Sequence, residues 1–378
     1  MTSAAEVLRE LVSINSVNPD LVPGAAGEVE IAAFCTKWLE ARGFEVHRLE
    51  ERKGRPSIVG IARGRGGGRS LMFNGHIDTV TLAGYDGDPL LPKMEEGKIF
   101  GRGSFDMKSG VAAMMVAAAR AAKQGLSGDI LVACVADEEY ASTGTAEVAR
   151  HFKVDGAVVT EPSHLELTLA HKGFVWFDVV IEGRAAHGSR PDIGIDAITK
   201  AGHFLVALEA HGLKLLAGKG HPVLRTGSVH ASIIKGGEEL SSYPASCRIS
   251  IERRTIPGET GDSVEEELTA ILDGIARAVP DFRYRMERGL ERVPFEAKTD
   301  EPIVACVRKH ATEALGRAPK IRGEPFWTDC AILKEAGIPS LLFGADGAGA
   351  HAATEWASIE SVEMLSRILE RTAVEFCA

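Results

Sequence analysis

The sequence lacks three features that would place it in a common class of proteins. Its 6 cysteines form no Cys-x-x-Cys pair, its apolar runs are short, and positive charge is not in excess. The longest charge-free apolar stretch near the middle, Ser109–Ala119, is too short to span a bilayer. Glu and Arg interrupt the first residues, so no secretory signal is expected. We therefore expect a cytoplasmic protein with reduced, mostly buried thiols and no membrane association.

Net charge and chain length further limit the partners and the number of domains that the protein can have. The chain has 43 Lys and Arg against 53 Asp and Glu, a formal net charge of −10. Phosphate repels such a chain, so nucleic acid is not expected as a partner. A hydrophobic share of 45% and a charged share of 25% are ordinary for a globular protein. Its 378 residues exceed the ~250–300 at which single cores stop growing, so two domains are expected.

Apolar periodicity predicts an α/β domain that a smaller α+β domain interrupts. Short Val- and Ile-rich runs first alternate with helical segments, which is typical of a mostly parallel sheet with helices on both faces. The rhythm then changes to longer β-rich runs and two helices, which predicts a small antiparallel sheet. The expected domains are residues 1–172 and 293–378 for the first and 173–292 for the inserted one. The strands expected in the first domain are Ser57–Ala62, Ser70–Asp78, Asp129–Ala136, Ala157–Thr160 and Pro339–Gly344.

Acidic and imidazole side chains follow two of these strands directly. The run SLMFNGHIDTV ends with His76 and Asp78, a ligand histidine pattern with a carboxylate to orient the ring. The run DILVACVADEEY ends in Asp137, Glu138 and Glu139. Like charges at the end of a core strand repel each other and need a cation or strong hydrogen bonds. Taken alone, each motif also fits a structural pair or a solvated charged face.

Three more residues share this setting. Asp106, in the glycine-bounded GRGSFDMKSG, either caps the helix expected over Met107–Gln124 or bridges two cations. Glu161 follows the apolar run AVVT, and His351 follows SLLFGA and a glycine-rich turn. Sites in open α/β sheets gather at the carboxyl ends of strands, so one pocket with more carboxylates than one cation needs is expected. Mixed nitrogen and oxygen ligands favour two zinc ions, with cobalt or manganese as alternatives.

Together the ordered motifs GHIDTV, GRGSFDMKSG, DEE, TEP and GAH…E resemble the M20 metallopeptidase family over nearly the whole chain. That family includes acetylornithine deacetylase, succinyl-diaminopimelate desuccinylase, aminoacylase-1 and glutamate carboxypeptidase. The resemblance implies a zinc-exopeptidase-like fold and the following roles: one metal held by His76, Asp106 and Glu161, the other by Asp106, Glu139 and His351, with Glu138 as general base and Asp78 orienting His76.

The resemblance also implies roles outside the metal set. His187, in GRAAHGSRP, matches an oxyanion-binding histidine of the inserted domain that reaches the other subunit, which implies a homodimer through that domain. Arg254, in ERRTIPGE, matches an arginine that binds the substrate carboxylate, with a solvated arginine as the alternative. Thr328, in FWTDC, is a candidate substrate contact. Ser241 and Asp196 stand where the family usually has Asn, so the sequence departs from the family pattern at two positions related to substrate binding.

The expected reaction follows from the same resemblance. In the family, the residue at the Glu161 position tends to be Glu in deacylases and carboxypeptidases and Asp in aminopeptidases and dipeptidases. We therefore expect a deacylase of the acetylornithine deacetylase type that acts on a small N-acylated amino acid in amino-acid metabolism. A metallocarboxypeptidase or dipeptidase on the same scaffold is the alternative. A non-enzymatic binding protein is a third hypothesis, against which the intact ligand set and Glu138 argue.

Overall fold

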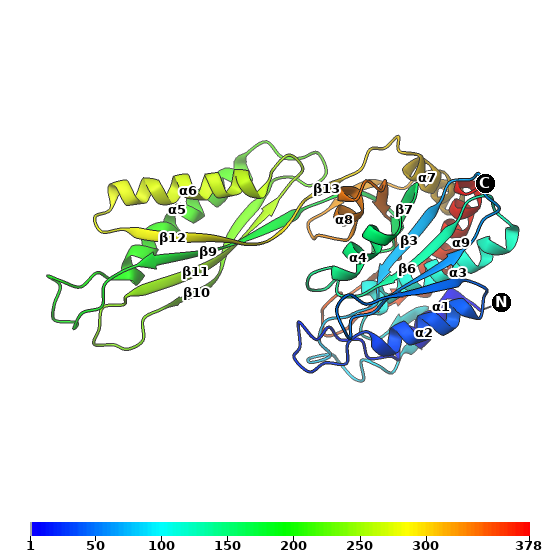
Figure 1. Cartoon of the computed structure of the whole chain (residues 1–378), viewed down its shortest axis with the longest axis horizontal. Coiled ribbons are helices and arrows are strands. Elements are labelled where there is room, and N and C mark those ends of the chain that lie inside the picture. The colour runs from blue at the N-terminus through cyan, green and yellow to red at the C-terminus, as the bar shows by residue number, and fades with distance from the viewer. Residues whose placement is uncertain (1) are drawn as a thin grey trace. The chain divides into compact units, whose positions relative to one another are not determined.

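The computed structural model describes residues 2–378, and the elements below are those of that part of the chain. The chain divides into two compact units (Figure 1). Unit 1 contains the residues up to Leu169, Ala297–Arg322 and Thr328–Ala378, and unit 2 contains Ala170–Glu296 and Gly323–Trp327. The domain boundaries expected after residues 172 and 292 stay a prediction, because a compact unit is not by itself a domain that folds alone.

Most strands of a nine-stranded sheet form the centre of unit 1 (Figure 1). The strands of this sheet lie in the order β1 (Glu45–Leu49), β2 (Ser57–Ala62), β6 (Ile130–Val135), β3 (Leu71–His76), β7 (Gly156–Val159), β15 (Ser340–Leu342), β8 (Leu167–His171) and β13 (Phe295–Glu296), and β14 (Ile321–Glu324) also pairs with β8. Strand β13 and the ends of β8 and β14 are counted with unit 2. The four middle strands, from β6 to β15, are parallel, and the flanking strands pair antiparallel. The predicted mostly parallel α/β fold is confirmed.

Helices cover this sheet, and α3 is the most deeply buried of them. The helices of unit 1 are α1 (Ala4–Val12), α2 (Val29–Glu40), α3 (Ser109–Ala121), α4 (Thr143–His151), α7 (Pro302–Leu315), α8 (Cys330–Glu335) and α9 (Ile359–Phe376). Helix α3 packs against β3, β6, α1 and α9. Its sequence SGVAAMMVAAARA is small and apolar on all sides, which suits a helix enclosed by other elements. It begins at Ser109, two residues later than expected, after an irregular turn over Ser104–Lys108.

A small second sheet lies in the same unit and borders the turn before α3. It consists of β16 (Gly347–Ala348), β17 (Trp356–Ser358), β5 (Lys98–Phe100) and β4 (Lys93–Glu95). The loop between β16 and β17 contains His351. This sheet therefore joins the His351 loop to the chain segment that precedes Asp106.

Unit 2 is a four-stranded antiparallel sheet with two helices on it (Figure 1). The strands are, in order, β10 (Ser228–Gly236), β11 (Ser246–Thr255), β9 (Gly173–Glu182) and β12 (Arg283–Arg292), and the helices are α5 (Ala197–Ala217) and α6 (Gly261–Ala278). Alternate residues of β9 are buried, because successive side chains of a strand point to opposite faces of the sheet. They pack with Phe204 and Leu208 of α5 and Leu268 and Leu272 of α6. The predicted α+β arrangement is confirmed.

Two expectations from composition can be compared with the described residues. All six cysteines are buried and none forms a disulfide. Within residues 2–378, no helix combines the length and the apolar character that a membrane crossing requires.

Close packing of α3 on the sheet leads to the first prediction. A Cβ added at Gly110 would lie 2.0 Å from the carbonyl oxygen of Thr160, so α3 or the end of β7 must move. We expect Gly110→Ala to lower the free energy of unfolding by about 1–3 kcal/mol, as overpacked cores do. The matched control is Gly274→Ala in α6, where the added Cβ meets nothing within 4 Å and helix propensity favours Ala by up to ~1 kcal/mol. Denaturant unfolding measures both, and a Gly110→Ala protein as stable as the control would contradict the packing.

Candidate active site

The four parallel strands all end at one edge of the sheet, and side chains that can bind metal follow each of them. His76 is the last residue of β3, Glu138 and Glu139 come soon after β6, and Glu161 follows β7. His351 is reached from β15 through a glycine-rich loop. Because the carboxyl ends of neighbouring parallel strands meet, residues far apart in the sequence converge there.

Asp106 lies between the two histidines. Its Oδ1 is 3.2 Å from Nε2 of His76, and its Oδ2 is 3.2 Å from Nε2 of His351. Glu161 Oε1 lies 3.5 Å from Nε2 of His76, and Glu139 Oε2 lies 3.2 Å from Nε2 of His351. The structure thus brings together all five residues predicted as metal ligands.

The helix-cap alternative for Asp106 is wrong. The residue that precedes α3 is Lys108, and no side chain caps the helix there. Lys108 is itself buried and donates to the carbonyl oxygens of Leu11 and Ile14, which ties the end of α1 to this turn.

Glu355 holds the turn that carries Asp106. Its buried carboxylate accepts hydrogen bonds from the backbone N–H groups of Gly103, Phe105 and Asp106 at 2.9–3.0 Å. It also pairs with Nη1 of Arg102 at 2.8 Å. No role was predicted for Glu355, although it is the last residue of GAH…E. Glu355 lies in the same loop as His351. This loop therefore supplies one candidate ligand, His351, and also the carboxylate that holds the turn of a second, Asp106.

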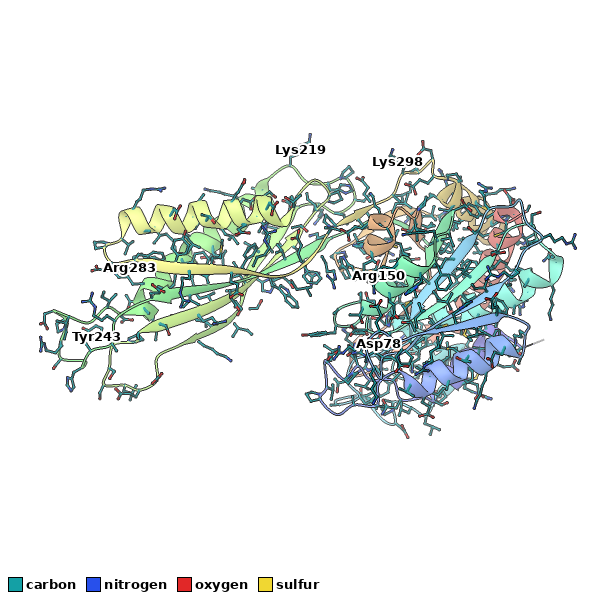
Figure 2. All side chains as sticks on the ribbon, viewed as in Figure 1. Asp78, Arg150, Lys219, Tyr243, Arg283 and Lys298 are labelled. Atoms are coloured by element: carbon teal, nitrogen blue, oxygen red, sulfur yellow. The ribbon has the colours of Figure 1, made fainter. Side chains whose placement is uncertain are left out.

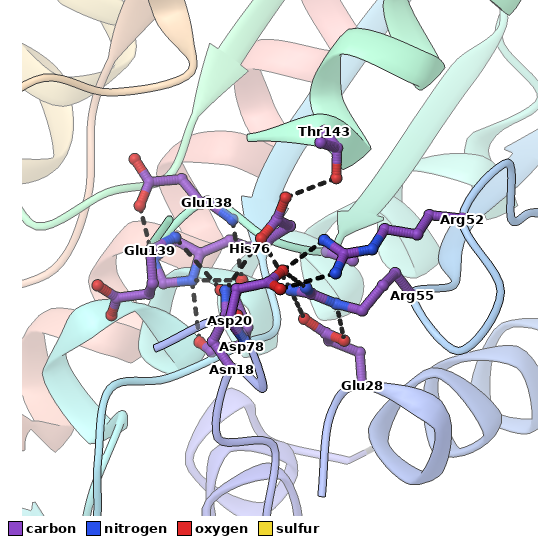
Figure 3. Close-up of polar contacts among 12 residues, drawn as sticks. Asn18, Asp20, Glu28, Arg52, Arg55, His76, Asp78, Glu138, Glu139 and Thr143 are labelled. Atoms are coloured by element: carbon purple, nitrogen blue, oxygen red, sulfur yellow. Dashed lines mark hydrogen bonds and ion pairs between the residues drawn. The ribbon is translucent and has the colours of Figure 1, made fainter. Parts of the chain in front are cut away.

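Asp78 lies next to His76 (Figure 3), and its role as the orienting carboxylate stays a prediction. Nδ1 of His76 is 3.0 Å from the backbone oxygen of Asp78 and 3.5 Å from its Oδ1. The Asp78 carboxylate also accepts hydrogen bonds from the backbone N–H groups of Glu138 and Glu139, each at 3.2 Å. One buried side chain therefore contacts both His76 and the segment that carries the acidic pair.

Burial and crowding shift the proton affinities of these groups. Burial, followed by the charge of Glu161, raises the pKa of Glu138 well above its usual value. Burial likewise raises the pKa of Glu139 and of Glu161. Hydrogen bonds to Asp106 and Glu139 raise the pKa of His351 to about 10. The carboxylates and histidines of the site hold their protons tightly, because nearby positive charges do not balance the negative charge of the carboxylates.

These residues fit a pair of divalent cations. Asp106, Glu138, Glu139 and Glu161 with two neutral imidazoles would carry four negative charges, which two divalent ions balance. Oxygen and nitrogen atoms of His76, Asp106 and Glu139, and of His76, Glu138 and Glu161, lie within 4.8 Å of one another. These groups differ from the predicted ligand sets, because they include Glu138, the predicted base, and do not include His351, whose Nε2 nevertheless lies 3.2 Å from both Asp106 and Glu139. Oε1 of Glu139 is buried without a hydrogen-bond partner, as a free ligand atom would be.

His187 and Ser241 lie close together in unit 2. Both are exposed, the N–H of Gly188 donates to the carbonyl oxygen of Ser241 at 2.7 Å, and His187 forms a bridge with Ser242. Asp196 has a local explanation, since its carboxylate caps α5 by accepting from the N–H of Thr199 at 2.9 Å.

The remaining predicted substrate contacts stay predictions. Arg254, also in unit 2, pairs with Glu252 at 2.7 Å and lies 5.2 Å from the ring centroid of Phe174. Thr328 is buried, and its hydroxyl accepts from the N–H of Cys330 at 3.4 Å. Its neighbour Asp329 is buried as well, and burial raises the pKa of that carboxyl to about 6.

Comparison with known proteins gives a consistent result. Residues 72–375 match the peptidase family M20/M25/M40. The chain is 29% identical to an acetylornithine deacetylase of Myxococcus xanthus, over 98% of this chain and 96% of that protein. It is 26% identical to a succinyl-diaminopimelate desuccinylase of Parvibaculum lavamentivorans, with coverages of 97% and 93%. A Bacillus cereus aminopeptidase has a similar fold, with a TM-score of 0.80, 19% identity and 98% coverage of both chains.

The excess of carboxylates predicts how stability depends on metal and pH. The pKa of Glu139 lies above its ordinary 4.5, and that of His351 is about 10 instead of 6.5. Both groups bind protons more tightly in the folded protein than in the unfolded chain. The stability that this proton binding contributes is fully present below the ordinary pKa values. It is lost as pH rises through the higher pKa values of the folded protein. The chelated protein should therefore lose stability progressively from about pH 5 to about pH 10.

Bound zinc should suppress this loss, because cations replace the missing protons. Saturation at 100 times Kd would add about 2.7 kcal/mol, and the gap in Tm between zinc-loaded and chelated protein should widen with pH. Thermal melting across this range measures the gap. A gap that is absent, or that narrows as pH rises, would rule out a metal site in this cluster.

Proposed function

Because the chain belongs to the peptidase family M20/M25/M40, whose members hydrolyse amide bonds, we propose that it removes the acyl group from a small N-acyl amino acid. The observation that carries the proposal is the position of Glu138. This carboxylate lies beside the candidate ligands, with Oε2 4.0 Å from Nε2 of His76, and the backbone N–H of Glu138 is held by Asp78. A base beside a paired metal site is the arrangement that amide hydrolysis by water needs.

Two divalent ions would be held by the residues already described. His76, Asp106 and Glu161 would bind one, and Asp106, Glu139 and His351 the other, with zinc favoured over cobalt or manganese. When bound, such a pair supplies an acidified water and a polarised carbonyl. The carboxylates of the cluster lose their mutual repulsion at the same time.

The chain's own residues would move the proton. Glu138 accepts a proton from the attacking water at its carboxylate and passes it to the leaving nitrogen. Burial and the charge of Glu161 raise the pKa of Glu138 in the metal-free cluster. Asp78 keeps His76 and the Glu138 backbone in place throughout.

The choice of substrate class rests on Glu161 and on the relatives. A glutamate at this position favours deacylases in the resemblance, and relatives similar over nearly the whole chain are named as a deacetylase and a desuccinylase. Arg254 is proposed to bind the substrate carboxylate and Thr328 to contact the substrate. A carboxypeptidase or dipeptidase activity is the second candidate, since an aminopeptidase has the same fold. Six buried, unpaired cysteines support a reducing compartment such as the cytoplasm.

A substrate panel tests this function. The zinc-, cobalt- and manganese-loaded protein should cleave N-acetyl or N-succinyl amino acids faster than dipeptides, as followed by the release of free amine. Glu138→Ala is the matched control. It should keep its metals and lose at least ~10²-fold in kcat, since a general base contributes that much or more. Faster cleavage of dipeptides would favour the second candidate, and unchanged turnover in Glu138→Ala would exclude Glu138 as the base.

We also propose that unit 2 forms a homodimer interface. Helix α5 exposes apolar side chains at helical spacing, with Val206, Leu213 and Leu216 each more than 60% exposed. The neighbouring edge strand β10, which pairs only with β11, exposes Ile233 and Ile234. Such an edge and helix face suit a two-fold interface. His187 would then donate a hydrogen bond to the oxyanion in the active site of the partner subunit.

Mixed dimers test this assignment. His187→Ala and Glu138→Ala should each be inactive alone, whereas their co-expression should restore about one quarter of the activity. Half of the dimers are then mixed, and in each of these one site combines an intact Glu138 with an intact His187 from the other subunit. Sedimentation of the wild type should show a dimer. A monomer, or no recovery in a verified mixture, would refute the shared site.

A further inference from the structure

Asp137, the first acid of the DEE segment, does not join the candidate ligands. Its backbone has a φ of 72°, a conformation that residues with side chains rarely adopt. Its fully buried carboxylate accepts hydrogen bonds from Thr143 Oγ1 at 2.7 Å, from Arg55 Nη2 at 2.9 Å and from Asn18 Nδ2 at 3.1 Å (Figure 3). Because Glu138 and Glu139 follow directly, the anchoring of Asp137 decides where this acidic pair begins.

The side chain of Asn18 connects Asp137 to Asp78, the carboxylate that contacts His76. Its side-chain amide donates to Oδ2 of Asp78 at 2.8 Å and to Oδ1 of Asp137 at 3.1 Å. Asn18, Asp78 and Asp137 are all fully buried, so neither carboxylate can exchange this donor for bulk water. A single –NH₂ group therefore connects the two acids that hold His76 and the Glu138–Glu139 backbone.

Arg55 completes the network on the side away from the ligands. Its guanidinium is only 4% exposed and binds Glu28 through two hydrogen bonds of 2.8 and 2.7 Å. It also contacts Asp20 and, through Nη2, Asp137. Without this cation, buried carboxylates would face one another unpaired, which is strongly unfavourable.

The loop that carries Asn18 is itself fixed to the catalytic edge of the sheet. The N–H of Asn18 donates to the carbonyl oxygen of Thr79 at 2.9 Å, and the N–H of Thr79 donates to that of Ser16 at 3.0 Å. These bonds lie directly beside Asp78. The loop between α1 and α2 thus approaches the site as a rigid support, with Asn18 at its point of contact.

We propose that Asn18 and Arg55 are positioning residues of the metal centre, which hold Asp78 and Asp137 so that His76 and the Glu138–Glu139 segment are in place before metal binds. Neither side chain is a predicted ligand. Outer partners of metal ligands typically change metal affinity or activity by about 10–100-fold when they are removed. The inference rests on the metal binding of the proposed function and on no particular substrate.

The test replaces Asn18 by an apolar residue of similar size. Asn18→Leu removes both donors, so the metal-free protein should bind Zn²⁺ about 10–100-fold more weakly in calorimetry. With Co²⁺ as the probe, the visible absorption spectrum should change, because the geometry around His76 is altered. The matched control is Asn15→Leu in the same loop, where the side chain bonds to the N–H of Val17. Its metal affinity and cobalt spectrum should equal those of the wild type.

A folded Asn18→Leu protein with wild-type Zn²⁺ affinity and cobalt spectrum would overturn the proposal. If Asn18→Leu does not fold, the Arg55→Lys variant tests the same proposal. Lysine keeps the charge but cannot bind Glu28 through two parallel bonds and reach Asp137 as well, so Zn²⁺ affinity should again fall by about tenfold. Unchanged affinity in a folded Arg55→Lys protein would equally overturn it.

The same measurements separate this inference from the proposed function. A wild type that binds two metals but cleaves no acylated substrate contradicts only the function. A wild type that binds no divalent metal contradicts both.

Discussion

The mutual repulsion of buried carboxylates at the carboxyl edge of the sheet is the constraint on which the rest of this structure depends. Asp106, Glu138, Glu139 and Glu161 converge within a few ångströms, and since Glu161 is buried and the other three are half-buried, water screens their charges poorly. Two histidines compensate part of the charge, and protons would compensate more, since burial raises the pKa of each glutamate. Divalent cations compensate it best, because they bind these oxygen and nitrogen atoms directly.

Holding such a cluster together before a cation arrives requires rigid support, and the fold supplies it from several directions. Glu355 clamps the turn of Asp106 through three backbone N–H groups. Asp78 fixes His76 and the backbone of the acidic pair. Close packing of Gly110 on Thr160 brings α3 against the strand end that carries Glu161. The supporting residues are thus as deeply buried as the groups that they position.

Unit 2 differs from unit 1 in the direction of its strands and in the placement of its helices. Its sheet is antiparallel and packs both helices on one face, so strand edges and helix surfaces stay available at its periphery. The exposed apolar residues of α5 and β10 suit contacts between chains better than contacts with water.

Much of this organisation could be predicted from the sequence by itself. Apolar runs that end abruptly in His76, the DEE segment or Glu161 predict buried strands with a polar edge, because local hydrophobicity and strand length are properties of the chain. The ordered motifs were sufficient to predict the family, and they indicated which side chains meet at that edge. The change to longer β-rich runs and two helices after about residue 172 predicted a small antiparallel sheet in the inserted segment.

What only the tertiary structure decided is which way neighbouring residues face and which distant residues support them. Asp137 and Glu138 are adjacent and both acidic, yet the positive φ at Asp137 turns one toward Arg55 and leaves the other beside His76. Asn18 and Arg55 lie far along the chain from the residues that they hold and stand in no motif, whereas Glu355 closes the GAH…E motif but its hydrogen bonds to the Asp106 turn appear only in the folded chain. Their roles arise from backbone direction and from long-range packing, which sequence periodicity does not contain.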